Sequence, residues 1–275
     1  MTEIFDQYLR LLGIEGCPSG LHGLRTLVRR HLSCVPFENI SKLLLYDRER
    51  TVRVTAMREF LDGIEDWDLG GTCYTNNPYL TDLLRALGYD ADLLGADMSR
   101  PNVHTCIRVR IGPAAYHVDV GFAAPLREPI RLDGLPAEVD EGSNRYVLDW
   151  DRGSGGLRLS MFSGAGNAEG YVAHEPARPR EFFDPVVLNS YAPDAWFLNR
   201  LRISRIFDGY SVDLIDRKLW RHEGGETSVT HLASMAELKA AVEGQFRMPR
   251  CPIERAVAIL ERIMGQPFFG GAAGA

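Results

Sequence analysis

Residues 70–77 read Gly70-Gly71-Thr72-Cys73-Tyr74-Thr75-Asn76-Asn77 and lead directly into an amphipathic helix, in which Leu80, Leu83, Leu84 and Leu87 share one face before Gly88. The paired glycines allow a tight turn and a close approach of the backbone to a ligand. A cysteine that begins a helix meets unpaired N–H groups and the positive end of the helix dipole, which favour its thiolate. The same N–H groups can hold a developing oxyanion. The stretch therefore predicts either a reactive Cys73 or a structural turn with a buried thiol.

A thiol nucleophile needs an imidazole within hydrogen-bond reach and a third group that fixes the imidazole tautomer. Apolar residues alternate with polar ones over 103–111 and 116–122, which predicts two neighbouring antiparallel strands. His104 and Asp119 lie on the same polar face of these strands and form the best pair for this role. His117 shares that face and is the rival base.

The register of this hairpin is an open point in the sequence. A symmetric turn about residues 112–115 places His104 opposite residue 123, about four residues from Asp119. A twist, a bulge or an asymmetric turn must therefore bring the two side chains together. Cys106, on the face of His104, is either a second thiol near the site or a small buried residue.

Three patterns follow one another along the chain. Residues 1–90 show mainly helical periodicity, and residues 91–188 read as short strands between clusters of Gly, Pro and Asp. Such strands favour a β-barrel or a strongly bent sheet. Residues 189–275 mix the two signals, with two strands over about 204–219 and a helix over 235–246. The pattern predicts an α+β fold.

Composition and charge exclude several classes of function. The chain has 275 residues, 45% hydrophobic and 25% charged, as in ordinary globular proteins. Its formal charge of −6 is spread without a basic stripe, so we expect no nucleic-acid partner. No signal-type segment or run of about 18 apolar residues occurs, which predicts a cytoplasmic protein without a membrane partner. The five cysteines stand singly, and the histidine spacings do not suit a metal.

Four short segments that follow one another along the chain together indicate a family. They are Val35-Pro36-Phe37-Glu38-Asn39, Gly70-Gly71-Thr72-Cys73, Val103-His104-Thr105 and Val118-Asp119-Val120-Gly121-Phe122. The order of these segments, the intervals between them and their residues resemble the motifs of the arylamine N-acetyltransferases. The likeness extends over most of the chain. A single segment is a weak signal, whereas the ordered set is specific.

The resemblance implies an architecture of three domains within the α+β class. It implies an N-terminal helical bundle over residues 1–90, which carries the nucleophile, and a central β-barrel over 91–188, which carries the histidine and the aspartate. A C-terminal mixed α/β lid covers 189–275. The three surround a cysteine-protease-like Cys-His-Asp core.

The resemblance also implies ping-pong transfer of an acetyl group from acetyl-CoA to an arylamine or arylhydrazine, through an acyl-cysteine and without a metal. In this mechanism Cys73 is the nucleophile, His104, in preference to His117, is the base, and Asp119 orients the base. Other positions implied by the resemblance are acceptor-pocket walls at Phe37 and Phe197, which can also be core residues, and cofactor contacts at Val103, Gly121 and Phe122. The expected partners are thus a small aromatic amine or hydrazine and coenzyme A, and a homodimer is compatible with the sequence.

Some residues depart from the family pattern. Leu69 replaces an arginine that commonly pairs with the glutamate at Glu38, so Glu38 needs another partner or lies exposed. Thr75 replaces an acidic residue, and Ala123-Ala124 replace two glycines near the cofactor. Three alternative functions therefore stay open: a macrolactam-forming amide synthase with the same triad, a cysteine hydrolase, and a non-catalytic CoA-binding relative.

Overall fold

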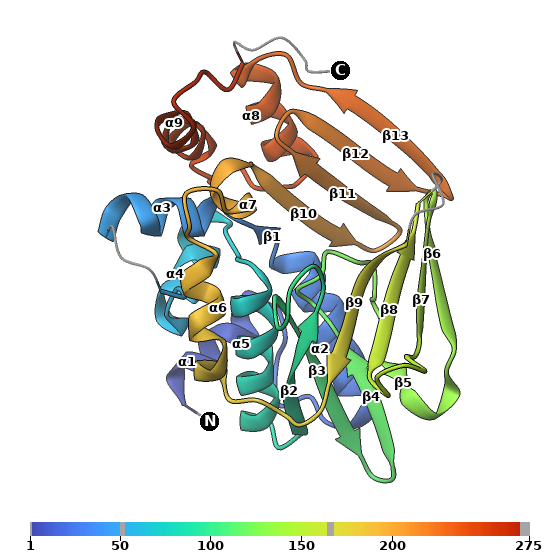
Figure 1. Cartoon of the computed structure of the whole chain (residues 1–275). Helices are drawn as coiled ribbons and strands as arrows, with labels where there is room; N and C mark the ends of the chain where they lie inside the picture. Colours follow the sequence, from blue (N-terminus) through green and yellow to red (C-terminus); the bar gives the residue numbers. More distant parts are fainter. Residues whose placement is uncertain (1, 50–52, 164–167, 270–275) are drawn as a thin grey trace.

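The computed structural model describes residues 2–49, 53–163 and 168–269. Helices form the N-terminal part, an eight-stranded sheet follows, and a five-stranded sheet with further helices forms the C-terminal part (Figure 1). The predicted α+β fold class is confirmed. Among the described helices, none has the length and apolar character needed to cross a membrane.

The N-terminal helices follow the helical periodicity of the sequence. They are α1 (Glu3–Leu11), α2 (Gly20–Cys34), α3 (Ile40–Glu49), α4 (Met57–Trp67) and α5 (Cys73–Ala86). Helix α3 is not predicted by the sequence pattern, because its consecutive leucines at 43–45 obscure the helical period. Helix α5 buries Leu80, Leu83 and Leu84 completely, and truncation of such a leucine to alanine costs about 2–5 kcal/mol. This packing fixes the helix whose first residue is Cys73.

The eight-stranded sheet is antiparallel throughout and forms an incompletely closed barrel (Figure 1). Its strands in chain order are β2 (Asp90–Asp97), β3 (His104–Ile111), β4 (Ala114–Val118), β5 (Ile130–Arg131), β6 (Ala137–Glu141), β7 (Asn144–Trp150), β8 (Leu157–Phe162) and β9 (Ala168–His174). The spatial order is β5-β4-β3-β2-β9-β8-β7-β6, and within the described residues β5 and β6 are its two ends. A short helix, η1 (Leu132–Gly134), follows β5. Helix α5 packs against β2 and β3, and hydrogen bonding between Thr105 and Cys73 places the start of α5 at the start of β3.

The five-stranded sheet combines distant parts of the chain. Its strands are β1 (Phe37–Glu38), β10 (Arg202–Phe207), β11 (Tyr210–Ile215), β12 (Lys218–Glu223) and β13 (Glu226–His231), and the helices of this part are η2 (Arg180–Phe183), α6 (Asp184–Asn189), α7 (Trp196–Asn199), α8 (Met235–Gly244) and α9 (Ile253–Met264). The sequence predicted two strands over about 204–219, a span that covers β10, β11 and only the start of β12. Strand β13 was not predicted, because its exposed residues carry no alternating apolar pattern.

Strand β1 joins the N-terminal part to the C-terminal sheet. Phe37 lies opposite Ser204 of β10, and it also forms an isolated parallel bridge with Gly71. The segment before Cys73 is therefore tied to a sheet formed mainly by residues after position 200. The proposed domain boundaries at 90 and 188 stay a prediction, and β1 contacts across both of them.

Candidate active site

Gly70 and Gly71 allow the backbone before Cys73 to pack closely against its surroundings. A Cβ atom at Gly70 would collide with the carbonyl oxygen of Pro36, and one at Gly71 would collide with Oγ1 of Thr75. Neither glycine has a positive φ, so close approach rather than an unusual turn requires glycine here. The close contacts are with protein atoms, and they set the position from which α5 starts.

Cys73 is the first residue of α5 and is 6% exposed. Its Sγ atom lies 3.9 Å from the carbonyl oxygen of Val103, and the Thr105 hydroxyl donates to the Cys73 carbonyl at 2.9 Å. The first turn of a helix leaves its N–H groups without acceptors inside the helix. The thiol therefore lies beside N–H donors and against the start of β3.

His104 and Asp119 form a buried pair behind Cys73. Nε2 of His104 lies 2.8 Å from Oδ2 of Asp119, and the two residues are 3% and 1% exposed. Burial lowers the pKa of His104, but the charge and hydrogen bond of Asp119 raise it more, and a hydrogen bond with Cys73 adds to this. The pKa of His104 is thus well above its usual value. Because Nε2 is engaged by Asp119, Nδ1 is the nitrogen that remains for the thiol.

A tight two-residue hairpin brings Asp119 closer to His104. Ile111 pairs with Ala114, so the turn contains only residues 112–113, and this register, continued to the start of β3, would place His104 opposite Gly121 instead of residue 123. Strand β4 ends at Val118, and Asp119 is therefore free to turn out of the ladder toward the beginning of β3. Tight turn and strand end together close the gap that the sequence left open.

Asn77 holds Asp119 in place, a function that sequence analysis did not assign. Its side-chain amide donates to Oδ1 of Asp119 at 2.9 Å and also to the carbonyl of Thr105, while its oxygen accepts from the N–H of Val120 at 3.0 Å. Burial raises the pKa of Asp119, but the charge and hydrogen bond of His104 and the Asn77 bond outweigh it and keep that pKa below its usual value. The signal available in the sequence was a second amide one helical turn after the cysteine.

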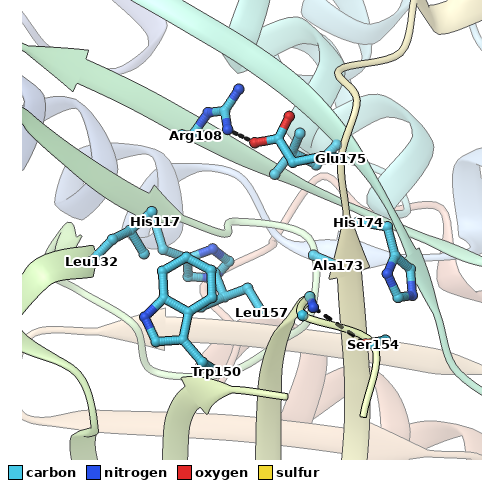
Figure 2. A pocket seen from close by; sticks show the side chains of 12 residues that line it. Arg108, His117, Leu132, Trp150, Ser154, Leu157, Ala173, His174 and Glu175 are labelled. Atoms are coloured by element: carbon cyan, nitrogen blue, oxygen red, sulfur yellow. Dashed lines mark hydrogen bonds and ion pairs between the residues drawn. The ribbon is translucent and has the colours of Figure 1, made fainter. Parts of the chain in front are cut away.

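His117, the rival base, faces a different space. Its Nε2 lies 2.9 Å from the Tyr171 hydroxyl, and burial lowers the pKa of His117 to about 4, so the ring is neutral at pH 7. Figure 2 shows His117 in the wall of a hollow, together with Trp150 and with Arg108, which pairs with Glu175. The volume of this hollow is about 170 Å³. Cys73 does not line this hollow. The structure thus separates His117 from the thiol.

Glu38 is fully buried, although the arginine expected to neutralise it is replaced by Leu69. Its carboxylate accepts hydrogen bonds from the N–H groups of Ser41 at 2.8 Å and Gly70 at 3.1 Å. Burial raises the pKa of Glu38, and these N–H groups counteract the rise only in part. Of the two expectations, another partner or exposure, the first describes the structure: backbone N–H groups replace the arginine.

Of the remaining predicted positions, Phe122 and Gly121 lie beside His104 and Cys73, and Phe37 and Phe197 form a separate aromatic pair. The ring of Phe122 stands edge-on to His104 at 5.5 Å, and a Cβ atom at Gly121 would lie 2.8 Å from Cα of Cys73. The rings of Phe37 and Phe197 pack edge to face, with 5.9 Å between the ring centres. Asn39 fixes this pair, because its amide donates to the Phe197 carbonyl at 2.9 Å. Asn39 belongs to one of the sequence motifs, but the sequence alone does not indicate this role.

The fold agrees with the comparisons with known proteins. Residues 20–250 match the sequence profile of the N-acetyltransferase family, and the chain belongs to this family. The resemblance seen in the sequence is therefore confirmed at the level of the family. As a member of this family, the protein is a transferase.

Individual relatives extend over nearly the whole chain. The arylamine N-acetyltransferase of Mycolicibacterium smegmatis is 28% identical over 255 residues, which cover 87% of this chain and 90% of that protein. The solved structure of the arylamine N-acetyltransferase from Mycobacterium abscessus aligns with a TM-score of 0.79 at 23% identity, covering 95% of both chains. The Mycobacterium marinum enzyme in complex with CoA gives a TM-score of 0.78 at 23% identity, covering 94% of this chain and 99% of that one. The structural likenesses establish the fold.

Proposed function

We propose that this protein transfers an acetyl group from acetyl-CoA to an arylamine or arylhydrazine through an acyl-cysteine on Cys73. The observation that carries the proposal is the buried His104–Asp119 pair, 2.8 Å between Nε2 and Oδ2, beside a cysteine that begins a helix. Relatives named arylamine N-acetyltransferases, one of them solved with CoA, support the choice of donor and acceptor.

The first half-reaction acylates the enzyme. His104 takes the thiol proton, and the Cys73 sulfur attacks the thioester carbonyl of acetyl-CoA. N–H groups in the first turn of α5 stabilise the oxyanion of the tetrahedral intermediate. The carbon–sulfur bond to coenzyme A then breaks, and the departing thiolate receives the proton from His104. Asp119 stays ionised and holds the imidazolium.

The second half-reaction transfers the acetyl group to the amine. The amine nitrogen attacks the acyl-cysteine while His104 accepts a proton from it, and Cys73 leaves and is reprotonated. An amine of low basicity is unprotonated at neutral pH, which suits aromatic amines and hydrazines. The contacting rings of Phe37 and Phe197 supply an apolar surface for an aromatic acceptor. We propose that acetyl-CoA is contacted by Val103, Gly121 and Phe122.

Mass spectrometry after incubation with acetyl-CoA alone tests the proposal. We expect an acetyl adduct on Cys73, its loss when an arylamine is added, and stoichiometric release of coenzyme A. Cys73→Ala should form no adduct. Cys106→Ala is the matched control, because this fully buried second thiol should be dispensable for acylation.

The same experiment separates the alternative functions. Release of coenzyme A at a rate that does not depend on the amine would identify a hydrolase. Acylation of the protein only by a long acyl chain carried on a synthase would identify an amide synthase. A protein that binds acetyl-CoA but forms no adduct would be a non-catalytic relative. Any of these three results contradicts the proposal.

We also propose that the protein acts in the cytoplasm. All five cysteines are free thiols, and Cys73 and Cys106 are buried close to the site. Reduced thiols persist in a reducing compartment. The homodimer and the three-domain division stay predictions, and sedimentation velocity checks the first of them.

A further inference from the structure

Lys42 is a buried cation that the mechanism above does not use. The residue lies on α3 and is 8% exposed. Its Nζ atom donates to the carbonyl and hydroxyl oxygens of Ser190, at 2.6 and 2.8 Å. Nζ also lies 4.2 Å from the ring centre of Tyr191 and 6.0 Å from that of Phe197. Because Phe197 contacts Phe37, the amine borders the proposed acceptor surface.

The protein provides no carboxylate for this amine within the residues that the structure describes. Burial lowers the pKa of Lys42 to about 7, and the one charge that raises it is on Cys73. The amine therefore lies within electrostatic reach of the nucleophile. A buried ammonium without a counter-ion is unfavourable, and an anion supplied by a ligand relieves that penalty.

Lysine is rare in this chain, and the other lysines behave differently. The sequence has three lysines among 31 Lys and Arg residues, so nearly all cationic side chains of the chain are arginines. Lys218 and Lys239 are exposed. The hydrogen bonds from Lys42 to Ser190 require only a neutral donor. A role in structure alone thus leaves the choice of an ionisable amine at this position unexplained.

We propose that Lys42 binds a carboxylate of the substrate that occupies the site beside Cys73. This inference rests on the proposed function and adds a substrate class to it. An aromatic acceptor against Phe37 and Phe197 can direct a ring carboxylate to Nζ, as an aminobenzoate does. The acyl chain on Cys73 can present the same charge if it ends in a carboxylate, as a malonyl group does. The recognised chemistry is the same in both cases.

The acceptor arm of the test compares 4-aminobenzoate with the uncharged 4-aminobenzamide, each with acetyl-CoA. Lys42→Gln keeps an amide donor for Ser190 and removes the charge. A hydrogen-bonded charge pair of this kind corresponds to about a 10- to 100-fold change. We expect kcat/KM for 4-aminobenzoate to fall by that factor, chiefly through KM, with little change for 4-aminobenzamide. Lys218→Gln is the control, because Lys218 also lies over a ring, that of Trp220 at 4.8 Å, but on the surface.

The donor arm compares malonyl-CoA with acetyl-CoA, with 4-aminobenzamide as acceptor throughout. A selective loss with malonyl-CoA in Lys42→Gln assigns the carboxylate to the acyl chain, and a selective loss in the acceptor arm assigns it to the amine. Either result supports the inference. Equal effects of Lys42→Gln on charged and uncharged substrates in both arms would overturn it.

Calorimetry distinguishes failure of this inference from failure of the proposed function. Binding of 4-aminobenzoate and of malonyl-CoA is measured with the wild-type protein and with Lys42→Gln, without turnover. Carboxylate binding that depends on Lys42, in a protein that forms no acyl adduct, supports the inference and contradicts the proposed function. An acyl-transferring enzyme whose binding of both carboxylates is unchanged in Lys42→Gln contradicts the inference alone.

Discussion

Nε2 of His104 lies 2.8 Å from Oδ2 of Asp119, although the register of their hairpin does not place the two residues opposite each other. The contact exists because the turn between β3 and β4 contains only residues 112–113 and because β4 ends at Val118. It gives the imidazole a buried anionic partner and raises its pKa. The reactivity proposed for Cys73 depends on this contact.

Replacing Asp119 with asparagine tests the electrostatic part of the pair. The Asp119 charge stabilises the imidazolium, so its removal lowers the pKa of His104. The alkaline limb of the pH profile for acylation, which reports loss of the imidazolium proton, should therefore move to lower pH. The rate should fall by about 10³-fold or more, as for an orienting aspartate in a triad. Stopped-flow acylation over pH 5–10 measures both, and an unmoved alkaline limb would contradict this assignment.

Asn77→Ala tests the positioning of Asp119. The change removes the amide that holds the carboxylate and leaves the Val120 N–H without an acceptor, at a cost of about 1–3 kcal/mol in unfolding free energy. We expect a drop in acylation rate of roughly 10- to 100-fold. Asn76→Ala is the control, since Asn76 is equally buried but donates to the Gly71 carbonyl instead. If both variants lose the same activity, the effect of Asn77 is structural only.

Gly121→Ala tests how closely the backbone must approach the nucleophile. The added Cβ would lie 2.8 Å from Cα of Cys73 and 2.6 Å from Nδ2 of Asn77. Displacement of Cys73 by a fraction of an ångström to 1 Å should slow acylation by up to about 10²-fold. Gly134→Ala is a suitable control, because a Cβ there meets nothing within 4 Å. Acylation kinetics at full rate in Gly121→Ala would show that the contact is relieved without consequence.

Ala123→Gly should stabilise the protein. Ala123 has a φ of 63°, a left-handed conformation that costs a residue with a Cβ about 1–2 kcal/mol. Glycine removes this strain but adds roughly 0.4–1 kcal/mol of unfolded-chain entropy. We expect a net increase of about 0.5 kcal/mol in unfolding free energy, measured by urea denaturation. A decrease would mean that the Ala123 methyl makes contacts worth more than the strain.

Local patterns in the sequence were sufficient for several features of the site. The glycine pair before Cys73 and the leucine face of α5 predicted that the thiol begins a helix, because helix starts and periodicity depend on neighbours within a few residues. The ordered motifs indicated the family, which the comparison over residues 20–250 confirmed. Helix α3 was missed, because three adjacent leucines do not display a period.

Other features depended on contacts between residues far apart in the chain. Asn77 acts on Asp119 only because α5 packs across β2 and β3, and β1 reaches the C-terminal sheet only by pairing with β10. The surroundings of Glu38 and Lys42 likewise come from packing, which decides whether a charged side chain meets water, a backbone N–H or an aromatic ring. The sequence by itself determined which residue could be the nucleophile and the family in which it occurs. The family resemblance preferred His104 to His117, but only the tertiary structure decided how His104 comes to face Cys73, because strand register and turn length are set by the packing of the whole sheet.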